Sequence, residues 1–285
     1  GWQRGVRTKR ARRRKWRHTL RDANSETSAM TEGSKNVLVT GAAKRVGRVI
    51  ALDFARDGWA VAVHYHTSEA EAHEVVTTIR DRGGKAVALC ADLAREEDVE
   101  RLLPLAVESL GRLQCLINSA SAFERDSLGD ATPRTWHLHM AVNLRAPFLL
   151  TQSFFRQLAE GDQGNVINII DERVWNLTPH FVSYTVSKSA LWTLTRTLAP
   201  ALAPRVRINA IGPGEVMPSF HQTEQSFQRM CATMPLGRGT SPQEICEAIR
   251  FIIGAPSMTG QMIALDGGQH LGWLLPGQDG KIAAS

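Results

Sequence analysis

The stretch that decides the fold is Asn36–Gly47, NVLVTGAAKRVG. It begins with a short apolar run, Asn36–Thr40, which is typical of a buried parallel strand. A glycine-containing turn, Gly41–Gly47, leads into apolar side chains at helical spacing. A strand, a glycine-rich turn and a helix in this order are suited to bind a phosphate group, because backbone N–H groups at the helix N-terminus face the anion. The alternative is a plain strand-to-helix turn with two surface cations, Lys44 and Arg45.

Six further apolar runs alternate with helical patterns along the rest of the chain. The expected strands cover residues 59–64, 85–90, 113–117, 165–170, 206–211 and 261–265. Helical patterns cover residues 69–82, 98–110 and 184–202, and two more helices open near Thr132 and Thr240 with a proline in the first turn. This alternation predicts the α/β class: a single Rossmann-type doubly wound parallel sheet of about seven strands, flanked by helices.

Small and polar residues stand where these strands end. The positions are Gly41, His64, Asp92, Asn118, Asp171 and Gly212. Ligands of a doubly wound sheet bind outside the carboxyl ends of its strands, so this coincidence is a stronger signal than any one motif. Asp92 is suited to accept a hydrogen bond from an adenine amino group. The alternative is that it caps the helix that begins near Glu96.

The end of the second strand favours NADP(H) over NAD(H). An acidic residue at this place usually binds the ribose diol of NAD, but this chain has no carboxylate there before Glu69. The residues expected near a 2′-phosphate are Lys44, Arg45, His66 and Ser68. The alternative is that His64 and His66 are only polar residues at a strand end.

Tyr184 and Lys188 lie four residues apart in an expected helix and therefore share one of its faces. A nearby ammonium lowers the pKa of a phenol, so we expect Lys188 to make Tyr184 a usable proton donor. Asn143 interrupts an apolar helical pattern, and it either closes a structural hydrogen bond or holds a water in a proton path. Asp171 ends the fifth strand, where a helix cap or an ion pair with Arg173 are its alternative roles.

The composition, with 43% hydrophobic and 22% charged residues among 285, is that of an ordinary globular protein. The apolar runs are too short to span a bilayer, and the four cysteines form no C-x-x-C pair and no cluster with histidines. We therefore expect no membrane segment, no bound metal, free thiols and a reducing, cytoplasmic location.

The basic charge is concentrated at the N-terminus. Residues 1–29 hold ten Lys or Arg and two Asp or Glu, a net charge of +8, which leaves −2 of the total of +6 for residues 30–285. This segment is a disordered arm that binds nucleic acid or anionic lipid, a transit peptide, or a segment not native to the mature protein. We favour the last, because the chain begins with Gly1 and Met30 closely precedes the first strand. The expected organisation is the arm (1–29), one domain (30–273) with a lid at about 215–235, and a loose tail (274–285).

From Asn36 to about Trp273 the chain resembles the short-chain dehydrogenase/reductase family. The resemblance is carried by the TGAAKRVG turn, Asp92-Leu93, Asn118-Ser-Ala, Asn143, Tyr184-x-x-x-Lys188, Ile211-Gly-Pro-Gly214 and the final LDGG. It implies a dinucleotide held by Gly41, Lys44, Arg45, Val46, Gly47, His66, Ser68, Asp92, Leu93, Asn118, Ala120, Tyr184, Lys188, Pro213 and Gly214. It implies catalysis by Asn143, Asp171, Tyr184 and Lys188. In the family a Ser usually stands at the position of Asp171 and polarises a carbonyl, whereas a carboxylate cannot donate that hydrogen bond unless it is protonated.

Further residues resemble one branch of the family, the pteridine reductases and the related bacterial dihydromonapterin reductases. They are Arg45 in place of the middle glycine of the turn, HYHTS at 64–68, NSASAF at 118–123, and Asp171 ahead of YTVSK. The resemblance implies NADPH, with its 2′-phosphate near Arg45, His66 and Ser68, and a pteridine bound by Ser121, Phe123, Asp171 and Tyr184. Phe123 would stack on the pterin, while Asp171 would accept hydrogen bonds from its amidine-like edge.

We therefore expect NADPH-dependent reduction of a C=N bond in a dihydropterin. Tyr184 would supply the proton, Lys188 would hold the nicotinamide ribose, and Asn143 would order a water that resupplies the proton. The alternatives are a carbonyl reductase that acts on a 3-oxoacyl thioester or another ketone, and a non-catalytic NADP-binding sensor, which has no need for all three residues. Nucleic acid is a partner only if the arm is native. The Trp192-bearing helix and the C-terminal LDGGQHLGW resemble surfaces through which relatives form dimers or tetramers, so we expect a homo-oligomer.

Overall fold

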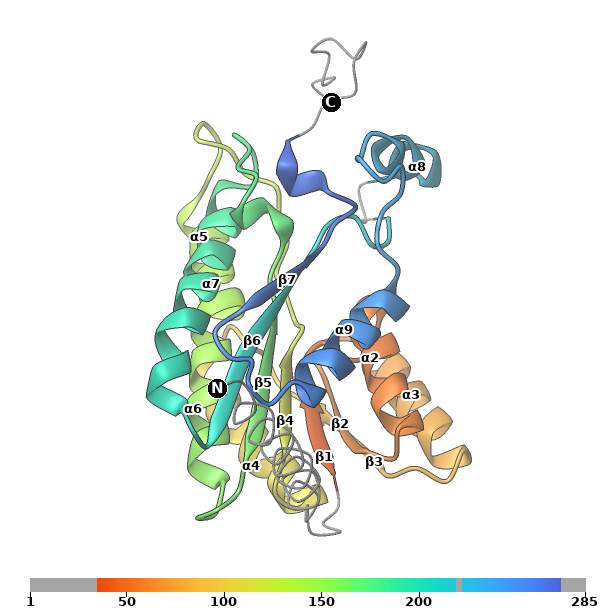
Figure 1. Cartoon of the computed structure of the whole chain (residues 1–285), viewed down its shortest axis with the longest axis vertical. Helices are drawn as coiled ribbons and strands as arrows, with labels where there is room; N and C mark the ends of the chain where they lie inside the picture. Colours follow the sequence, from red (N-terminus) through yellow and green to blue (C-terminus); the bar gives the residue numbers. More distant parts are fainter. Residues whose placement is uncertain (1–34, 219–221, 273–285) are drawn as a thin grey trace, which may run out of the picture. The chain divides into compact units, whose positions relative to one another are not determined.

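The computed structural model describes residues 35–218 and 222–272 of the chain. In them seven strands form one parallel sheet in the order β3-β2-β1-β4-β5-β6-β7 (Figure 1). The strands are β1 (Asn36–Val39), β2 (Ala60–Tyr65), β3 (Ala86–Cys90), β4 (Cys115–Asn118), β5 (Gly164–Ile169), β6 (Val206–Pro213) and β7 (Met262–Leu265). The predicted doubly wound sheet is confirmed. The expectations for residues 1–29 and 274–285, and for 219–221 of the lid, lie outside the described residues.

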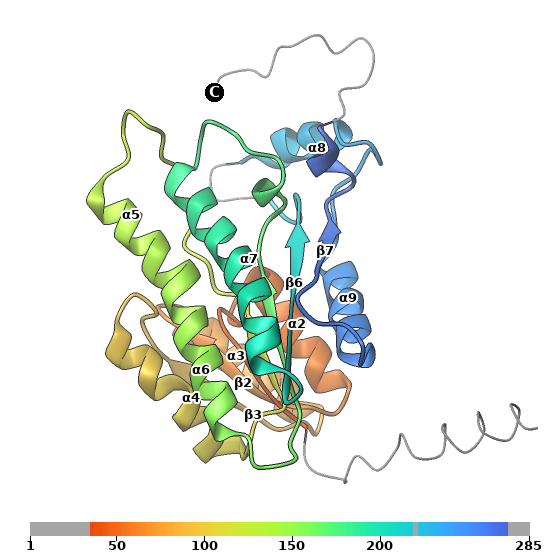
Figure 2. The same ribbon diagram turned by 60° about the vertical axis from the view of Figure 1, so that its left-hand side comes forward.

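Helices cover both faces of the sheet (Figures 1 and 2). One face is covered by α2 (Arg45–Arg56), α3 (Glu69–Asp81) and α9 (Pro242–Gly254). The other is covered by α4 (Glu96–Leu110), α6 (Ala146–Gln157) and α7 (Val182–Leu202). The remaining helices are α5 (Pro133–Met140), a π-helical turn (Ala141–Arg145), α8 (Glu224–Ala232) and two short 3-10 turns (Glu172–Val174 and Gln269–Leu271).

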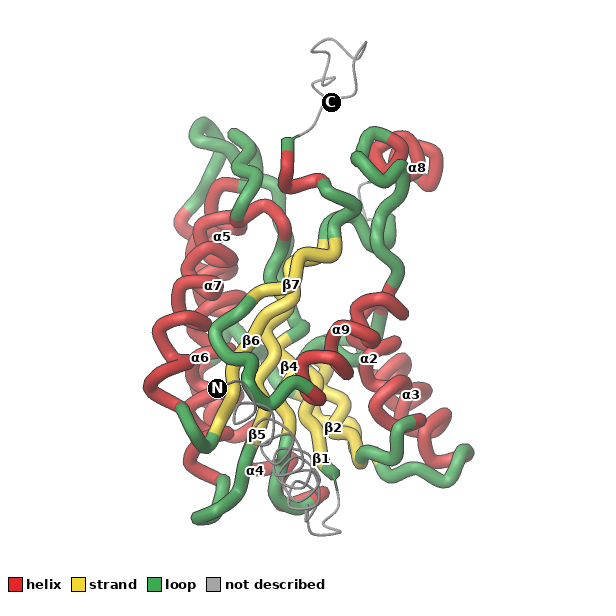
Figure 3. The backbone as a smooth tube through the Cα atoms, in the orientation of Figure 1, coloured by secondary structure: helices red, strands yellow, loops and turns green. Residues whose placement is uncertain are grey.

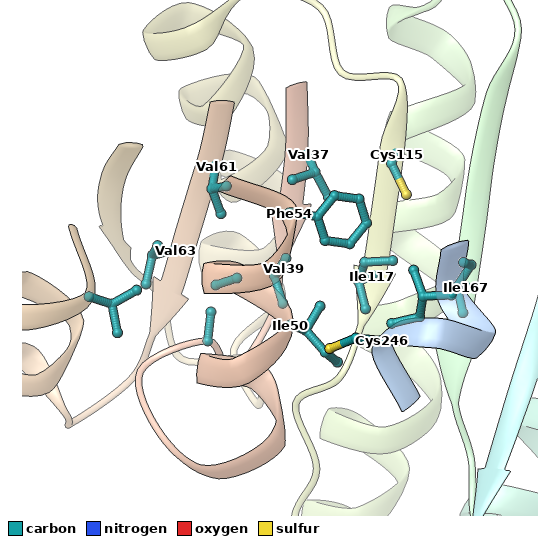
Figure 4. Packing of buried hydrophobic residues seen from close by; sticks show 14 of the residues in the cluster. Val37, Val39, Ile50, Phe54, Val61, Val63, Cys115, Ile117, Ile167 and Cys246 are labelled. Atoms are coloured by element: carbon teal, nitrogen blue, oxygen red, sulfur yellow. The ribbon is translucent and has the colours of Figure 1, made fainter. Parts of the chain in front are cut away.

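The strands are continuous apolar runs because side chains on both of their faces are buried. In β1, Val37 and Val39 face one core, and Leu38 between them faces the other. Figure 4 shows the first core, where Val37 and Val39 lie beside Ile50 and Phe54 of α2. All four are at most 5% exposed, so the turn between β1 and α2 rests on a rigid, close-packed base.

Two helix starts predicted from their caps are confirmed. The Thr132 hydroxyl accepts the Thr135 N–H ahead of α5, and Ser241 and Glu244 form a capping box ahead of α9. The alternative role of Asp92, as the cap of the helix near Glu96, is wrong. The N-cap of α4 is Arg95, and the Asp92 carboxylate instead accepts the Ala94 N–H at 2.9 Å in the preceding turn.

The strand order reverses between the paired strands β1 and β4, because the chain adds β2 and β3 beyond β1 and then adds β5, β6 and β7 beyond β4. The loops after these two strands diverge at that point, which is where ligands of doubly wound sheets bind. Figure 3 shows the loops that follow the strands gathered at one edge of the sheet, and α8 lies beyond this edge near the ends of β6 and β7.

In the described ranges, 35–218 and 222–272, every helix is too short or too polar to span a bilayer. These ranges also contain no group of three or more His, Cys, Asp or Glu side chains arranged to hold a metal ion. The four cysteines are all unpaired, and only Cys90 is exposed.

Candidate active site

The backbone of the turn between β1 and α2 packs against the backbone of the loop after β4. Gly41 has a φ of +66°, and a Cβ on it would lie 2.9 Å from the Cα of Ala120, so only glycine fits. A Cβ on Gly47 would overlap the carbonyl oxygen of Gly41. The Thr40 hydroxyl accepts the N–H groups of Ser119 and Ala120, both at 3.0 Å, and so ties the turn to the loop after β4. The N-terminus of α2 has no side-chain cap and no acidic residue in its first turn, which leaves it suited to an anion.

Buried His64 holds this turn against the neighbouring strands. Its Nδ1 accepts the Gly41 N–H at 3.0 Å, so Nε2 carries the proton and donates to the Ala91 carbonyl at 3.1 Å. Burial lowers the pKa of His64 to about 4 and keeps the ring neutral. The sequence interpretation of His64 as a polar strand-end residue missed this bridging role. The signal in the sequence that could have revealed this role is a histidine inside an apolar strand.

Arg45 stands at the entrance of α2 with a φ of 52°, a left-handed conformation that is costly for any residue with a Cβ. Its guanidinium donates to the carbonyl oxygens of Pro218, at 2.7 Å, and Met217, at 3.1 Å. These two residues belong to the expected lid segment. Arg45 therefore connects the turn between β1 and α2 with the first part of that segment.

The other residues expected at a 2′-phosphate lie beside the ends of β2 and β3. The Lys44 ammonium forms an ion pair with Glu71 at 2.7 Å. His66 is largely exposed, with its Nε2 3.9 Å from the Asp92 carboxylate. Ser68 is the N-cap of α3, but its side chain makes no capping hydrogen bond. The Ser68 side chain is therefore not used to cap α3.

The remaining residues expected at the dinucleotide also lie at strand ends. Val46 and Gly47 are in the first turn of α2, Leu93 is buried after β3, and Pro213 ends β6. The Gly214 N–H donates to the Leu265 carbonyl at 3.0 Å. At the end of β4, the Asn118 amide donates to Asn168 Oδ1 at 2.8 Å, and its own buried Oδ1 has no partner among the described residues.

Asp171, Tyr184 and Lys188 meet at the end of β5. The Tyr184 hydroxyl donates to Asp171 Oδ2 at 2.7 Å, and the Lys188 ammonium donates to the Ile169 carbonyl at 2.9 Å. Tyr184 and Lys188 are 5% and 2% exposed. Asp171 also caps the short turn that follows it, because its Oδ1 accepts the Arg173 N–H at 2.9 Å, and the Arg173 guanidinium lies 3.5 Å from Oδ2. Both alternative roles of Asp171 are thus present beside its contact with Tyr184.

The environment of Tyr184 corrects one expectation. Burial raises the pKa of Tyr184 well above its ordinary value, and the charge and hydrogen bond of Asp171 raise it further. Arg173 and a hydrogen bond with Ser121 act in the opposite direction but do not outweigh them. The expectation that the pKa of Tyr184 is lowered is therefore wrong. Burial in turn lowers the pKa of Lys188 to about 8, against the opposing effect of Asp171.

Asn143 lies in the π-helical turn between α5 and α6 and is fully buried. Its side-chain oxygen accepts the Ala122 N–H at 2.8 Å, and its NH₂ group donates to the Ala122 carbonyl at 3.0 Å and to Ser187 Oγ at 3.1 Å. Two roles were expected for the Asn143 side chain. In the structure it closes structural hydrogen bonds. Ser121 Oγ lies 3.4 Å from Asn143 Oδ1, at the open side of the same loop.

An aromatic wall stands beside Tyr184. The Phe123 ring meets the Tyr184 ring edge to face at 4.8 Å, and it stacks on Phe181 at 4.7 Å with an interplanar angle of 6°. The Arg173 guanidinium lies 5.8 Å from the centre of Phe123 and 5.2 Å from that of Phe181. Sequence reasoning found Phe123 but missed Phe181, which is 58 positions away and carries no motif.

Two acids lie near Arg173, the buried Glu172 and the half-buried Glu215. Burial raises the pKa of Glu172 to about 8, and the charge of Asp171 raises it further against the effect of Arg173. Burial also raises the pKa of Glu215, at the start of the expected lid. Glu172 is 2% exposed, and its Oε2 has no hydrogen-bond partner among the described residues. Nothing in the sequence pattern distinguished these two glutamates.

Comparison with known proteins agrees with this geometry. The model of the family described as short chain dehydrogenase matches residues 35–229. An uncharacterized oxidoreductase of Methylorubrum extorquens is 34% identical over 242 residues, which are 82% of this chain and 97% of that protein. The granaticin polyketide synthase putative ketoacyl reductase 2 of Streptomyces violaceoruber is 30% identical over 241 residues, covering 82% and 95% of the two chains.

Among solved structures, the chain is similar to FolM alternative dihydrofolate reductase 1 from Brucella suis in complex with NADP. The sequence identity is 45%, the TM-score is 0.82, and the match covers 85% of this chain and 97% of that one.

Proposed function

Because this chain belongs to the short-chain dehydrogenase/reductase family of oxidoreductases, we propose that it is an NADPH-dependent reductase of a pteridine. The observation that carries the proposal is the 2.7 Å hydrogen bond from Tyr184 to the Asp171 carboxylate, beside the ring of Phe123. A carboxylate at this place accepts hydrogen bonds where a hydroxyl would donate them. The site therefore favours a substrate that presents N–H donors and a flat ring, as a dihydropterin does.

The residues present fit NADPH. A Cβ would fill the close approach between Gly41 and Ala120, and the N-terminus of α2 beside it has no side-chain cap. The pyrophosphate would lie against this turn and the 2′-phosphate near Arg45, His66 and Ser68, in keeping with the NADP bound to the similar Brucella protein. When bound, NADPH supplies the hydride that reduces the substrate.

Asp171 is suited to recognise the amidine-like edge of a pterin. Each of its oxygens already accepts one hydrogen bond, from the Arg173 N–H and the Tyr184 hydroxyl. A carboxylate has about four acceptor sites, so capacity for two further N–H donors remains. With the substrate's donors at these two sites, the Tyr184 hydroxyl next to them would turn toward a ring nitrogen.

Tyr184 would then give its proton to the nitrogen of the C=N bond whose carbon receives the hydride. Its raised pKa keeps the phenol protonated before substrate binds. Lys188 beside it would stabilise the phenolate that forms and hold the nicotinamide ribose. Because the side chain of Asn143 is already hydrogen-bonded, a water in the proton path would bind its backbone carbonyl.

The substrate ring would stack on Phe123, as expected. One face of that ring is covered by Phe181, so the substrate would use the other face or displace Phe181. Residues 215–235 would act as the lid over this site, with Arg45 holding its first part at Met217 and Pro218.

Reduction of a ketone is the second candidate. Ser121 supports it, because its hydroxyl contacts Tyr184 and would supply the carbonyl-polarising donor that Asp171 lacks. The similarity to a putative ketoacyl reductase is consistent with this. An NADPH oxidation assay with dihydrobiopterin, dihydromonapterin, dihydrofolate and acetoacetyl thioesters separates the two candidates. We expect the pteridines to be reduced, and turnover of the thioester alone would overturn the proposal.

A further inference from the structure

A buried hydrogen-bonded cluster lies beside the catalytic centre and includes none of the residues used above. It consists of Asp126 in the loop after β4, His139 on α5 and Ser183 on α7, which are 1%, 0% and 0% exposed. The His139 ring packs edge to face against the Tyr184 ring at 5.9 Å. The loop after β4 and the following helix α5 are thus joined to the start of the distant helix α7, next to Tyr184.

The protons of this cluster can be assigned from its partners. The Glu124 backbone N–H donates to His139 Nε2 at 3.0 Å, so Nδ1 carries the proton of a neutral ring. Nδ1 therefore donates to Ser183 Oγ at 2.6 Å, and the Ser183 hydroxyl donates its own proton to the Asp126 carboxylate. Burial lowers the pKa of His139, which favours this neutral form.

This assignment excludes a nucleophilic serine. In a hydrolytic triad the histidine accepts the serine proton, but here His139 donates to Ser183 and its other nitrogen is occupied by a backbone N–H. Ser183 is also fully buried, so no substrate reaches it. The cluster therefore has a positioning role and takes no part in a reaction.

Asp126 supplies the cap that α7 lacks. The N-cap residue Phe181 makes no side-chain capping bond and has a left-handed backbone with φ of 57°. The Asp126 carboxylate accepts the Ser183 N–H at 3.2 and 3.3 Å, and the Asp126 carbonyl accepts the Phe181 N–H at 2.7 Å. A negative charge at this end of a helix is favourable, so the loop is bound firmly to the start of α7.

We propose that Asp126, His139 and Ser183 are positioning residues that lock the substrate loop, residues 119–131, onto the N-terminus of α7. The lock sets Phe123, on the loop, against Tyr184 and Phe181, on and next to α7. The lock thereby fixes the Phe123 ring, on which the substrate would stack, relative to the Tyr184 hydroxyl, which would donate the proton. The substrate class rests on the proposed function, whereas the lock itself does not.

The first test measures amide hydrogen exchange of the full chain without substrate. In Ser183→Ala we expect exchange at residues 122–127 and 181–183 to rise about tenfold or more, because one lost hydrogen bond to a charged group has this size. Ser183→Thr, which keeps the hydroxyl, should restore protection. The control Thr151→Val removes a buried hydroxyl of α6 that donates to Pro147 at 2.7 Å, and it should leave these segments unchanged.

The second test removes the hydrogen bonds of the two His139 nitrogens one at a time. His139→Gln keeps an acceptor near Glu124 and loses the donor to Ser183, and His139→Asn does the reverse, so each should loosen the lock about as much as Ser183→Ala. Activity is measured with whichever substrate the unmodified enzyme reduces, and is normalised to NADPH-binding sites. We expect KM to rise about tenfold while NADPH affinity stays within about twofold, because the cofactor turn has its own bonds through Thr40.

Unchanged exchange in both Ser183→Ala and Asp126→Asn would overturn the lock. A lower melting temperature together with an unchanged KM in the folded fraction would also overturn the lock, because this result indicates a purely structural role. Asp126→Asn keeps an acceptor for the Ser183 N–H and serves where Asp126→Ala fails to fold. If the unmodified enzyme reduces ketones and no pteridine, the proposed function fails, while the exchange experiment still decides on the lock.

Discussion

The Tyr184 hydroxyl donates to Asp171 Oδ2 at 2.7 Å, where the family usually has a hydroxyl. This contact raises the pKa of the phenol on top of the larger effect of burial. Tyr184, the proposed proton donor, and Asp171, the residue proposed to recognise the substrate, are thus one hydrogen-bonded unit. For a substitution at either residue, the effects on substrate binding and on proton transfer must both be measured.

Removal of the Tyr184 hydroxyl should abolish most turnover. We expect Tyr184→Phe to lower kcat with a dihydropterin by roughly 10²–10⁴-fold, the usual contribution of a positioned general acid. NADPH affinity should change little, since the ring and its packing against Phe123 remain. Stopped-flow reduction and fluorescence titration with NADPH measure the two quantities. Undiminished turnover would remove Tyr184 from the reaction.

The effect of Asp171 on the Tyr184 pKa can be measured directly, because the chain contains only two tyrosines, Tyr65 and Tyr184. In a Tyr65→Phe background the ultraviolet absorbance of tyrosinate reports Tyr184 alone. Asp171→Asn removes a negative charge that disfavours the phenolate, so the Tyr184 pKa should fall. The same variant should lose pteridine turnover. The exposed Glu108→Gln serves as control, and an unchanged or raised Tyr184 pKa in Asp171→Asn would contradict the role of the carboxylate.

Arg45 should matter more for the cofactor than for stability. Arg45→Gly removes the guanidinium and also relieves the left-handed φ of 52°. We expect the Kd for NADPH to rise about tenfold, the contribution of one charge-assisted hydrogen bond. The free energy of unfolding should change by no more than about 1 kcal/mol, because strain relief offsets the lost contacts with Met217 and Pro218. Calorimetric titration checks the first expectation and urea denaturation the second, with Arg45→Lys as the charge-preserving control. Equal NADPH affinity in Arg45→Gly would place the phosphates elsewhere.

The sequence predicted those parts of the molecule that depend on local rules. The strand, turn and helix of 36–56 form from their own apolar periodicity and glycines, and the caps at Thr132 and Ser241 follow from hydrogen bonds within one turn. Strand ends could be recognised because each apolar run stops at a polar or small residue. The sheet then brings these ends to one edge whatever the lengths of the connections.

Features that depend on tertiary distance and burial could not be predicted in this way. The stack of Phe181 on Phe123 joins two loops that share no motif. The pKa of Tyr184 was expected to follow the spacing to Lys188, but burial and the oxygen of Asp171 decide it. His64 bridges Gly41 and Ala91 through ring nitrogens whose partners appear only when three strands pair.

Glu172 predicts a dependence of stability on pH. Burial raises its pKa to about 8 in the folded protein, from the ordinary 4.5, so its protonated form is favoured by folding. The stabilisation is complete below the unfolded pKa and is lost as the pH rises through about 8, where the folded protein must hold a buried charge next to Asp171. Glu172→Gln imitates the protonated form. It should therefore match the unmodified protein at about pH 4.5 and exceed its free energy of unfolding by about 1 kcal/mol or more at about pH 9. Urea denaturation across this range measures the difference, with the exposed Glu108→Gln as control. A constant difference between the two proteins at all pH values would show that Glu172 does not titrate in this window.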